Sequence, residues 1–183
     1  MRSWPPGVAV ALALLCGAVP VNSATSGVHC GTARWDVKTL ADPAAKTLTT
    51  AVVPTTIDDL SVLKPPANPN SLPDRIAPVE TTLWSVRARL LAYWVESDSD
   101  YHLLLADPHS GKTFYGEIPS PDCVQSRQST YTRERAYVDA LGGHAAPIVT
   151  VAGYGFFDHV RGFPDVGQAP NGIEIHPALR IAR

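Results

Sequence analysis

Apolar and polar side chains alternate along residues 84–94, and this pattern constrains the fold more than any other feature. Side chains on a β-strand point to opposite faces in turn, so a period of two predicts a strand with one buried face. The segment is also unusually long for a strand. We therefore expect a long first strand whose buried face carries Trp84, Val86, Ala88, Leu90, Ala92 and Trp94.

The segments that follow have the character of shorter elements separated by turn residues. Residues 129–141 have the spacing of a helix that ends at a Gly-Gly pair. Two glycines in the segment after it suggest a bend or a bulge. The strands are expected at 101–107, 113–118, 147–157 and 173–181, with turns at 97–100 and 108–111.

Three strands, one helix and two strands form the chain order of the OB barrel. The sequence therefore predicts a mainly β protein: a small five-stranded OB-like barrel with one helix between strands 3 and 4. Other small barrels with a plugging helix share this order. The predicted division of the chain is a signal peptide at 1–24, an arm at 25–79 and the barrel domain at 80–183.

Residues 25–79 are punctuated by prolines, which exclude long helices and central strands. We expect this segment to be an arm that wraps the barrel rather than a second domain. Residues 55–60 favour a short helical turn, with Thr56 as its cap and Asp59 three residues further on. The prolines are Pro43, Pro54, Pro65, Pro66, Pro69, Pro73 and Pro78.

Residues 1–24 have the three parts of a cleavable export signal: a positive start at Arg2, an apolar run over 8–16 and small residues up to Ala24. The apolar run is shorter than the ~20 residues of a membrane-spanning helix. We expect a secreted or periplasmic protein with no transmembrane segment after cleavage. Cys16 follows the large Leu15, which disfavours lipid attachment, so it is expected to leave with the signal.

Removal of the signal changes both the charge and the cysteine count. Only Arg2 lies in it, which leaves 14 Lys and Arg against 17 Asp and Glu, a formal charge of −3. Such a balance gives no electrostatic reason to expect nucleic acid as a partner. Cys30 and Cys123 remain, and an oxidising compartment favours a disulfide between them over free or metal-bound thiols.

Four short motifs stand out in the C-terminal half: DYHLLLAD at 100–107, GEIP at 116–119 with Cys123, GFFD at 155–158 and APNGIEIHP at 169–177. With these motifs the chain resembles a family of uncharacterised secreted bacterial proteins with an OB-fold-like domain. The resemblance spans about residues 80–181 and brings no established activity. Where the family tends to show His-Gly-Gln, this chain has a longer loop over residues 159–168.

The residues most suggestive of chemistry are Asp158, His159, Glu174 and His176. Glu174 and His176 are two apart on a strand and share a face. Carboxylates and imidazoles together suit a divalent metal such as zinc, the only cofactor that the sequence suggests. The structural alternative is a lock, in which these side chains hold the neighbouring loop by hydrogen bonds.

A second acidic group lies around the first turn, at Glu96, Asp98, Asp100 and Asp107, with His102 nearby. It lacks the glycine and the distant glutamate of a calcium-binding EF-hand loop, so we expect a solvated turn. Residues 103–107 also look like a run in thermonuclease, another OB barrel. Tyr101 and His102 stand where that enzyme would need an arginine, so the likeness indicates shared barrel packing.

OB barrels bind oligonucleotides or sugars across strands two and three, with stacked aromatic rings. Tyr93, Tyr101 and Tyr115 are the candidate binding residues, whereas Trp84, Trp94 and Phe114 are expected in the core. No nucleophile elbow, P-loop or zinc-protease motif is present. The sequence favours a non-catalytic binding module for a sugar, peptide or protein. The alternative is a metal-dependent hydrolase, possibly nuclease-like, that uses the Asp158, His159, Glu174 and His176 group.

Overall fold

The computed structural model describes residues 27–142, 146–160 and 167–183. The predicted signal peptide over residues 1–24 lies outside these ranges. Within them, no helix has both the length and the apolar character needed to cross a membrane.

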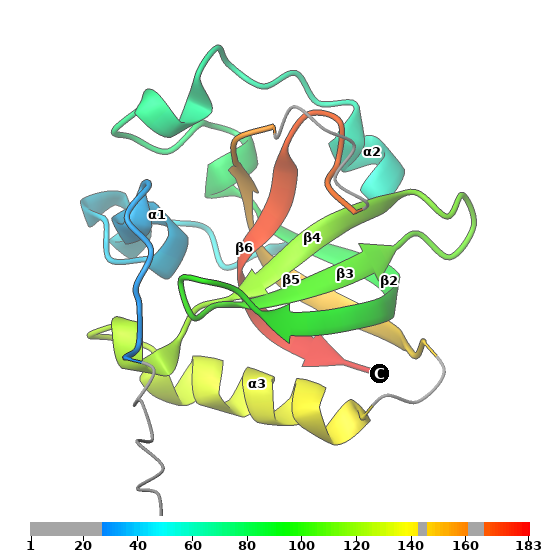
Figure 1. Cartoon of the computed structure of the whole chain (residues 1–183). Helices are drawn as coiled ribbons and strands as arrows, with labels where there is room; N and C mark the ends of the chain where they lie inside the picture. The colour runs from blue at the N-terminus through cyan, green and yellow to red at the C-terminus, as the bar shows by residue number, and fades with distance from the viewer. Residues whose placement is uncertain (1–26, 143–145, 161–166) are drawn as a thin grey trace, which may run out of the picture.

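Five strands close into a barrel (Figure 1), which confirms the OB-like fold predicted from the sequence. The sheet runs in the order β1-β2-β3-β4-β6-β5, where β1 (Val52–Thr55) is a short strand of the arm, and antiparallel pairing of β5 with β2 closes the barrel. The observed strands match the expected ones to within one or two residues. They are β2 (Leu83–Val95), β3 (Tyr101–Ala106), β4 (Thr113–Ile118), β5 (Ile148–Phe157) and β6 (Ile173–Ala182).

One helix, α3 (Gln128–Leu141), connects β4 to β5 and lies across the lower end of the barrel in Figure 1. Its buried residues are Tyr131, Glu134, Val138 and Leu141, which recur at three- and four-residue spacing on one face. Glu134 is held there because its Oε2 accepts a hydrogen bond of 2.7 Å from the backbone N–H of Ile181. The helix therefore closes this end of the barrel with both apolar and polar contacts.

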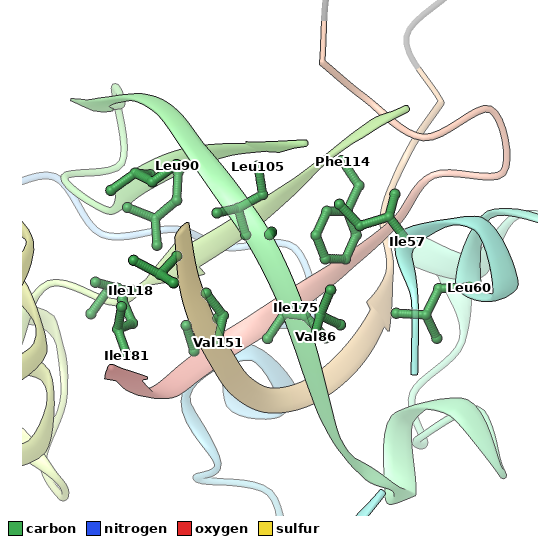
Figure 2. Close-up of a cluster of buried hydrophobic side chains, with 14 of the residues drawn as sticks. Ile57, Leu60, Val86, Leu90, Leu105, Phe114, Ile118, Val151, Ile175 and Ile181 are labelled. Atoms are coloured by element: carbon green, nitrogen blue, oxygen red, sulfur yellow. The ribbon is translucent and has the colours of Figure 1, made fainter. Parts of the chain in front are cut away.

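The barrel interior is filled by alternate side chains of every strand (Figure 2). The opposite end is closed by Ile57 and Leu60 of α2 (Ile57–Ser61), both fully buried. Burial of such a side chain stabilises a fold by roughly 1.5–3 kcal/mol, so α2 belongs to the core. The expected cap is confirmed, since Thr56 Oγ1 accepts a hydrogen bond of 3.0 Å from the Asp59 N–H.

The expectation that Trp94 lies in the core is wrong. The register of β2 against β3 shifts between Leu90 and Ala92. Such a bulge inserts one residue and reverses which face the following side chains occupy. Trp94 therefore pairs with His102 and packs on the outer face of the barrel, with ring centroids 5.7 Å apart.

The N-terminal segment wraps the barrel, as its prolines suggested, but also contains elements that the sequence did not predict. Helix α1 (Trp35–Thr39) lies beside the barrel in Figure 1, and β1 (Val52–Thr55) pairs in parallel with the start of β2. Pro54 is tolerated because β1 is an edge strand. Single 3-10 turns occur at Pro43–Lys46, Pro69–Ser71, Val79–Thr81 and Pro121–Cys123.

A disulfide between Cys30 and Cys123 confirms the pairing expected from the sequence. It joins the start of the arm to the segment between β4 and α3. Two hydrogen bonds strengthen the same junction. Trp35 Nε1 donates to the carbonyl of Cys123 at 3.4 Å, and the buried Tyr131 hydroxyl donates to the carbonyl of Thr39 at 3.2 Å.

Candidate functional site

The outer face of β3, β4 and β6 carries ionisable side chains where solvent would normally be. Ile175 points into the barrel, so the alternation of β6 places Glu174 and His176 on the outer face. Glu117 of β4 and His102 of β3 lie on the same side. The arm covers this face, so each of the four side chains is at least nine-tenths buried.

We call these four residues and their charged neighbours the buried ion cluster. Its members are Lys38, Glu96, Asp100, His102, Glu117, Asp158, Glu174 and His176.

Glu117 is the centre of the cluster because its carboxylate contacts both histidines. Its Oε1 lies 2.6 Å from Nε2 of His102, and its Oε2 lies 2.9 Å from Nδ1 of His176. The same Nδ1 is hydrogen-bonded to Oε1 of Glu174 at 3.1 Å. The other ring nitrogen of His176, Nε2, lies 3.5 Å from Oδ2 of Asp100. Three carboxylates therefore surround the His176 ring.

Lys38 of α1 connects the arm to the cluster. Its ammonium group lies 2.9 Å from Oδ2 of Asp158 and 3.9 Å from Oε1 of Glu174, and it stands 4.9 Å from the centre of the Phe156 ring. Asn70, further along the arm, donates to Oδ1 of Asp158 at 2.8 Å. The arm thus contacts the charged face of the barrel through the ammonium group of Lys38 and the amide group of Asn70.

Opposite charges keep the central groups ionised despite their burial. Burial alone would lower the pKa of His176, but the charge of Glu117 and the contacts of the ring nitrogens with the carboxylates of Asp100 and Glu117 hold that pKa well above its usual value. Burial alone would raise the pKa of Glu117, but the charge of His176 and contacts with both histidines hold that pKa well below its usual value. The pKa of His102 is raised in the same way, against burial, by Glu117.

Glu174 behaves differently from the other carboxylates. Burial and the nearby charge of Glu117 raise its pKa to about 7. Lys38 opposes that shift only in part. Glu174 is therefore the group of the cluster whose charge changes near neutral pH.

The cluster lies under the arm and not in an open cleft. His176 and Asp100 are fully buried, and Glu117 is 2% exposed. A buried ion network of this kind is costly to disrupt, because removal of one partner leaves the other charge without compensation. The burial of its central groups, Glu117, Glu174 and His176, suits it to hold the arm against the barrel or to hold an ion.

The structure brings together only part of the predicted metal set. Glu174 and His176 are in contact, whereas Asp158 reaches them through Lys38. His159 is exposed, and its backbone N–H donates to its neighbour Asp158 at 2.6 Å. Metal binding by these four residues stays a prediction.

Sequence reasoning missed the contribution of Asp100, which we expected in a solvated turn. That expectation is wrong, since Asp100 is fully buried and its Oδ1 accepts a hydrogen bond of 2.8 Å from the Ser120 N–H. Glu117 and Lys38 were missed as well. The one sequence signal for Glu117 was its two-residue spacing from Tyr115 on a strand, which does not indicate what covers that face.

The three candidate binding tyrosines do not share one exposed surface. Tyr93 and Tyr101 pack against each other with ring centroids 5.6 Å apart, and Arg135 lies 4.2 Å from the Tyr101 ring. Tyr115 is 5% exposed and meets Trp94 edge-on at 5.8 Å. A ligand role for these rings stays a prediction.

A different surface of the barrel is free. Arg87 and Arg89 of β2 and Arg180 of β6 are exposed on the outer face of β2, β5 and β6. Within the described part of the chain, their side chains have no ion pair or hydrogen bond. We call this surface the arginine face, and small side chains complete it: Ser85, Thr150, Ala152 and Ala182.

A groove of about 430 Å³ borders the arginine face where α3 meets β6. Arg180 lies on its rim, and Arg133, with a side chain 65% exposed, faces it from the helix. Aliphatic side chains are exposed at both ends of the face, Val52 beside β2 and Leu91 two residues after Arg89. The combination of arginine, aliphatic side chains and a shallow groove is typical of a docking surface.

Comparison with protein-family models, with curated proteins and with solved structures gave no match to this chain. The geometry of its own residues therefore carries the functional argument.

Proposed function

We propose that this protein is an exported, non-catalytic binding module that docks an acidic protein partner on its arginine face. The single observation that carries the proposal is the presence, on one face, of three exposed arginines that have no partner among the described residues, in a chain with a small net negative charge. Unpaired guanidinium groups favour carboxylates, which they bind in a bidentate manner.

The face on which OB barrels usually bind ligands is covered in this protein, which supports the choice of a different binding surface. That face lies over the second and third barrel strands, here β3 and β4. His102, Tyr115 and Glu117 on it are each 5% exposed or less, and arm residues such as Lys38 contact the same charged group. A ligand that takes this face would have to displace part of the chain.

The character of the arginine face favours a protein over other partners. Tyr137 lines only the bordering groove, and none of the described residues that form the face is aromatic. Its floor consists of small side chains, and exposed Val52 and Leu91 flank it. Arginine beside aliphatic contacts is common in protein–protein interfaces, where arginine is often a hot spot.

The Cys30–Cys123 disulfide supports export, because such bonds persist in oxidising compartments. Burial of the ion cluster supports a binding role over the alternative of a metal-dependent hydrolase, which would need access for its substrate. We also propose that the chain belongs to the family of uncharacterised secreted bacterial proteins that its C-terminal motifs resemble.

The test is binding of the mature, disulfide-intact protein to poly-L-glutamate, measured by isothermal titration calorimetry at low and high salt. We expect saturable binding that weakens with salt. The double variant Arg87→Glu/Arg89→Glu should lose about tenfold or more in affinity, a change of ~1.4 kcal/mol. The matched control is Lys46→Glu/Lys64→Glu, which makes the same charge change at two exposed positions of the arm and should bind within twofold of the parent.

Two further probes decide the class of partner. A sulfated polysaccharide or a single-stranded oligonucleotide that binds more tightly than poly-L-glutamate, and loses that affinity in the arginine variant, would overturn the assignment to an acidic protein. Failure of all three polyanions to bind at low salt would overturn the proposed arginine-face function altogether.

A further inference from the structure

We infer that Asp100, Glu117 and His176 form a buried site for one divalent transition-metal ion of the zinc type. The inference is independent of the proposed binding function. It also differs from the set Asp158, His159, Glu174 and His176 that the sequence suggested.

Within the described part of the chain, three buried atoms in this group lie in ion contacts but lack a hydrogen bond of good geometry: Oδ2 of Asp100, Oε2 of Glu117 and Nε2 of His176. An unpaired buried polar atom costs about 1–3 kcal/mol, and more when it is charged. The three side chains can each offer one ligand atom so that all three atoms lie within 4.8 Å of one another. Three such atoms at one place point to an ion that would satisfy them together.

The remaining polar atoms of the three side chains are all held by other residues. Asp100 Oδ1 accepts from the Ser120 N–H at 2.8 Å, and Glu117 Oε1 contacts Nε2 of His102 at 2.6 Å. Nδ1 of His176 is hydrogen-bonded to Glu174 at 3.1 Å. A metal-binding histidine almost always directs its second nitrogen to a carboxylate or carbonyl in this way, which fixes the ring and frees the other nitrogen for the metal.

The spacing suits a small cation. Nε2 of His176 lies 3.5 Å from Oδ2 of Asp100. Two ligands that each bind zinc at about 2.0–2.1 Å, in tetrahedral geometry, are about 3.3 Å apart. Glu117 Oε2 lies 2.9 Å from Nδ1 of the same ring without an aligned hydrogen bond, so it must turn from that nitrogen to bind the ion, and the three side chains already offer ligand atoms within 4.8 Å of one another.

The donor set and its charge indicate which ions fit. One imidazole nitrogen and two carboxylate oxygens are ligands that zinc accepts, whereas calcium prefers six to eight oxygens. The two carboxylates neutralise a divalent ion. His176 binds as neutral imidazole, so metal binding releases the proton from its Nε2.

Burial assigns this metal a structural role. Asp100 precedes β3, Glu117 lies in β4 and His176 lies in β6, so one ion would join three parts of the barrel directly beneath the arm. The alternative to a metal ion at this place is a proton on His176. A His176 ring protonated on both nitrogens also makes favourable contacts with the carboxylates of Asp100 and Glu174. A metal-bound site predicts one equivalent of metal per chain, whereas a protonated site predicts none.

The test measures metal content and thermal stability in the mature protein. After refolding with equimolar Zn²⁺ and dialysis against a weak chelator, plasma mass spectrometry should find one zinc per chain. A saturating excess of Zn²⁺ over the chelated protein should raise Tm by roughly 5–10 °C. Ca²⁺ should have no such effect. Co²⁺ in place of zinc should give the visible absorption of a four- or five-coordinate site.

The variants Asp100→Asn and His176→Gln should each abolish the zinc content and the shift in Tm. The matched control is His159→Gln, which removes an exposed histidine outside the group and should keep both. Because His176→Gln could fail to fold, the Co²⁺ spectrum of the unmodified chain provides a second readout that needs no variant. Less than a tenth of an equivalent of zinc with no shift in Tm would overturn the inference, as would loss of metal in His159→Gln but not in Asp100→Asn.

Discussion

His176 is surrounded by the carboxylates of Asp100, Glu117 and Glu174, and each of these residues is nearly or fully buried. Such an arrangement is stable only when the charges balance. Lys38, His102 and Arg135, which lies 3.9 Å from Asp100, supply the other positive charges. At the residue scale, the stability of the fold thus depends on a balance of buried charges, and a change in pH alters that balance.

The pH dependence of stability follows from Glu174, whose folded-state pKa of about 7 is above its ordinary value of 4.5. A carboxyl group with a raised pKa binds its proton more tightly in the folded state. Its contribution is complete below about pH 4.5 and is lost as pH rises through 7. The raised pKa values of His102 and His176 add stability at low pH that is also lost on going to alkaline pH.

We therefore expect the metal-free protein to be more stable at pH 5.5 than at pH 8, by a few kcal/mol. Glu117 sets the lower limit, because its depressed pKa makes the protein lose stability as pH falls below about 4.5. Urea unfolding in EDTA across this range measures the profile. Glu174→Gln should flatten the decline between pH 5 and 7. A variant with an undiminished slope would show that another group is responsible.

Gly153 is required for close approach of β5 and β6. A Cβ at this position would overlap the carbonyl oxygen of Pro177 and lie 3.0 Å from the Cα of Ala178, both backbone atoms. Gly153→Ala should therefore lower the free energy of unfolding by about 1–3 kcal/mol, as overpacking typically does. Gly27→Ala is the control, because no atom lies within 4 Å of its added Cβ. Chemical denaturation curves of equal stability for both variants would contradict this account.

At the scale of elements, β2 carries two different environments on one strand. Val86, Ala88 and Leu90 fill the barrel, while the intervening Arg87 and Arg89 form part of the arginine face. Beyond the bulge after Leu90, Trp94 belongs to the outer face of β3 and β4. One inserted residue therefore separates the core part of the strand from the part beside the buried ion cluster.

The arm is the element that depends most on covalent attachment. Its disulfide closes a loop with a sequence separation of 93 residues, which restricts the unfolded chain. We expect Cys30→Ser/Cys123→Ser to lower the free energy of unfolding by about 2–5 kcal/mol. Denaturation of the parent protein with and without reductant is the matched comparison. An unchanged midpoint in the double variant would mean that the noncovalent contacts alone hold the arm.

At the scale of the whole molecule, arm and barrel share buried contacts and are expected to unfold together. Glu80 illustrates the connection: its carboxylate binds the guanidinium of Arg34 at 2.6 and 2.8 Å and accepts from the Phe157 N–H at 3.1 Å. Ile57 and Leu60, which precede the barrel strands, lie in the same core as Val151 and Ile175 (Figure 2). We therefore expect arm and barrel to unfold as one cooperative unit.

The fluorescence of Trp35 reports on the folding of the arm, and the circular dichroism of the barrel strands reports on the folding of the barrel. In the mature protein without residues 1–24, and with Trp84→Phe/Trp94→Phe, Trp35 fluorescence and far-ultraviolet circular dichroism should give the same urea midpoint. Coincidence is expected because the Arg34–Glu80 and Lys38–Asp158 pairs break only when both parts separate. A fluorescence transition at clearly lower urea would show that the arm detaches first.

The sequence by itself determined the elements of the barrel and their order. Period-two alternation identified the first strand, turn residues delimited the others, proline spacing identified the arm, Thr56 identified a helix cap, and the cysteine pair identified the disulfide. Each of these features depends on residues close together in the chain or on the number of cysteines, so it can be recognised without knowledge of the tertiary structure. Alternation also placed Glu174 and His176 on one face of their strand.

Only the tertiary structure decided what covers that face and which groups meet there. Asp100, Glu117 and His176 are separated along the chain, and no local pattern shows that three strands and an arm bring them together. The bulge that moves Trp94 outward likewise leaves no mark in the alternation, because it depends on pairing with β3. The charge states of the cluster arise from burial and from mutual contact, two properties that belong to the folded chain and not to any of its segments.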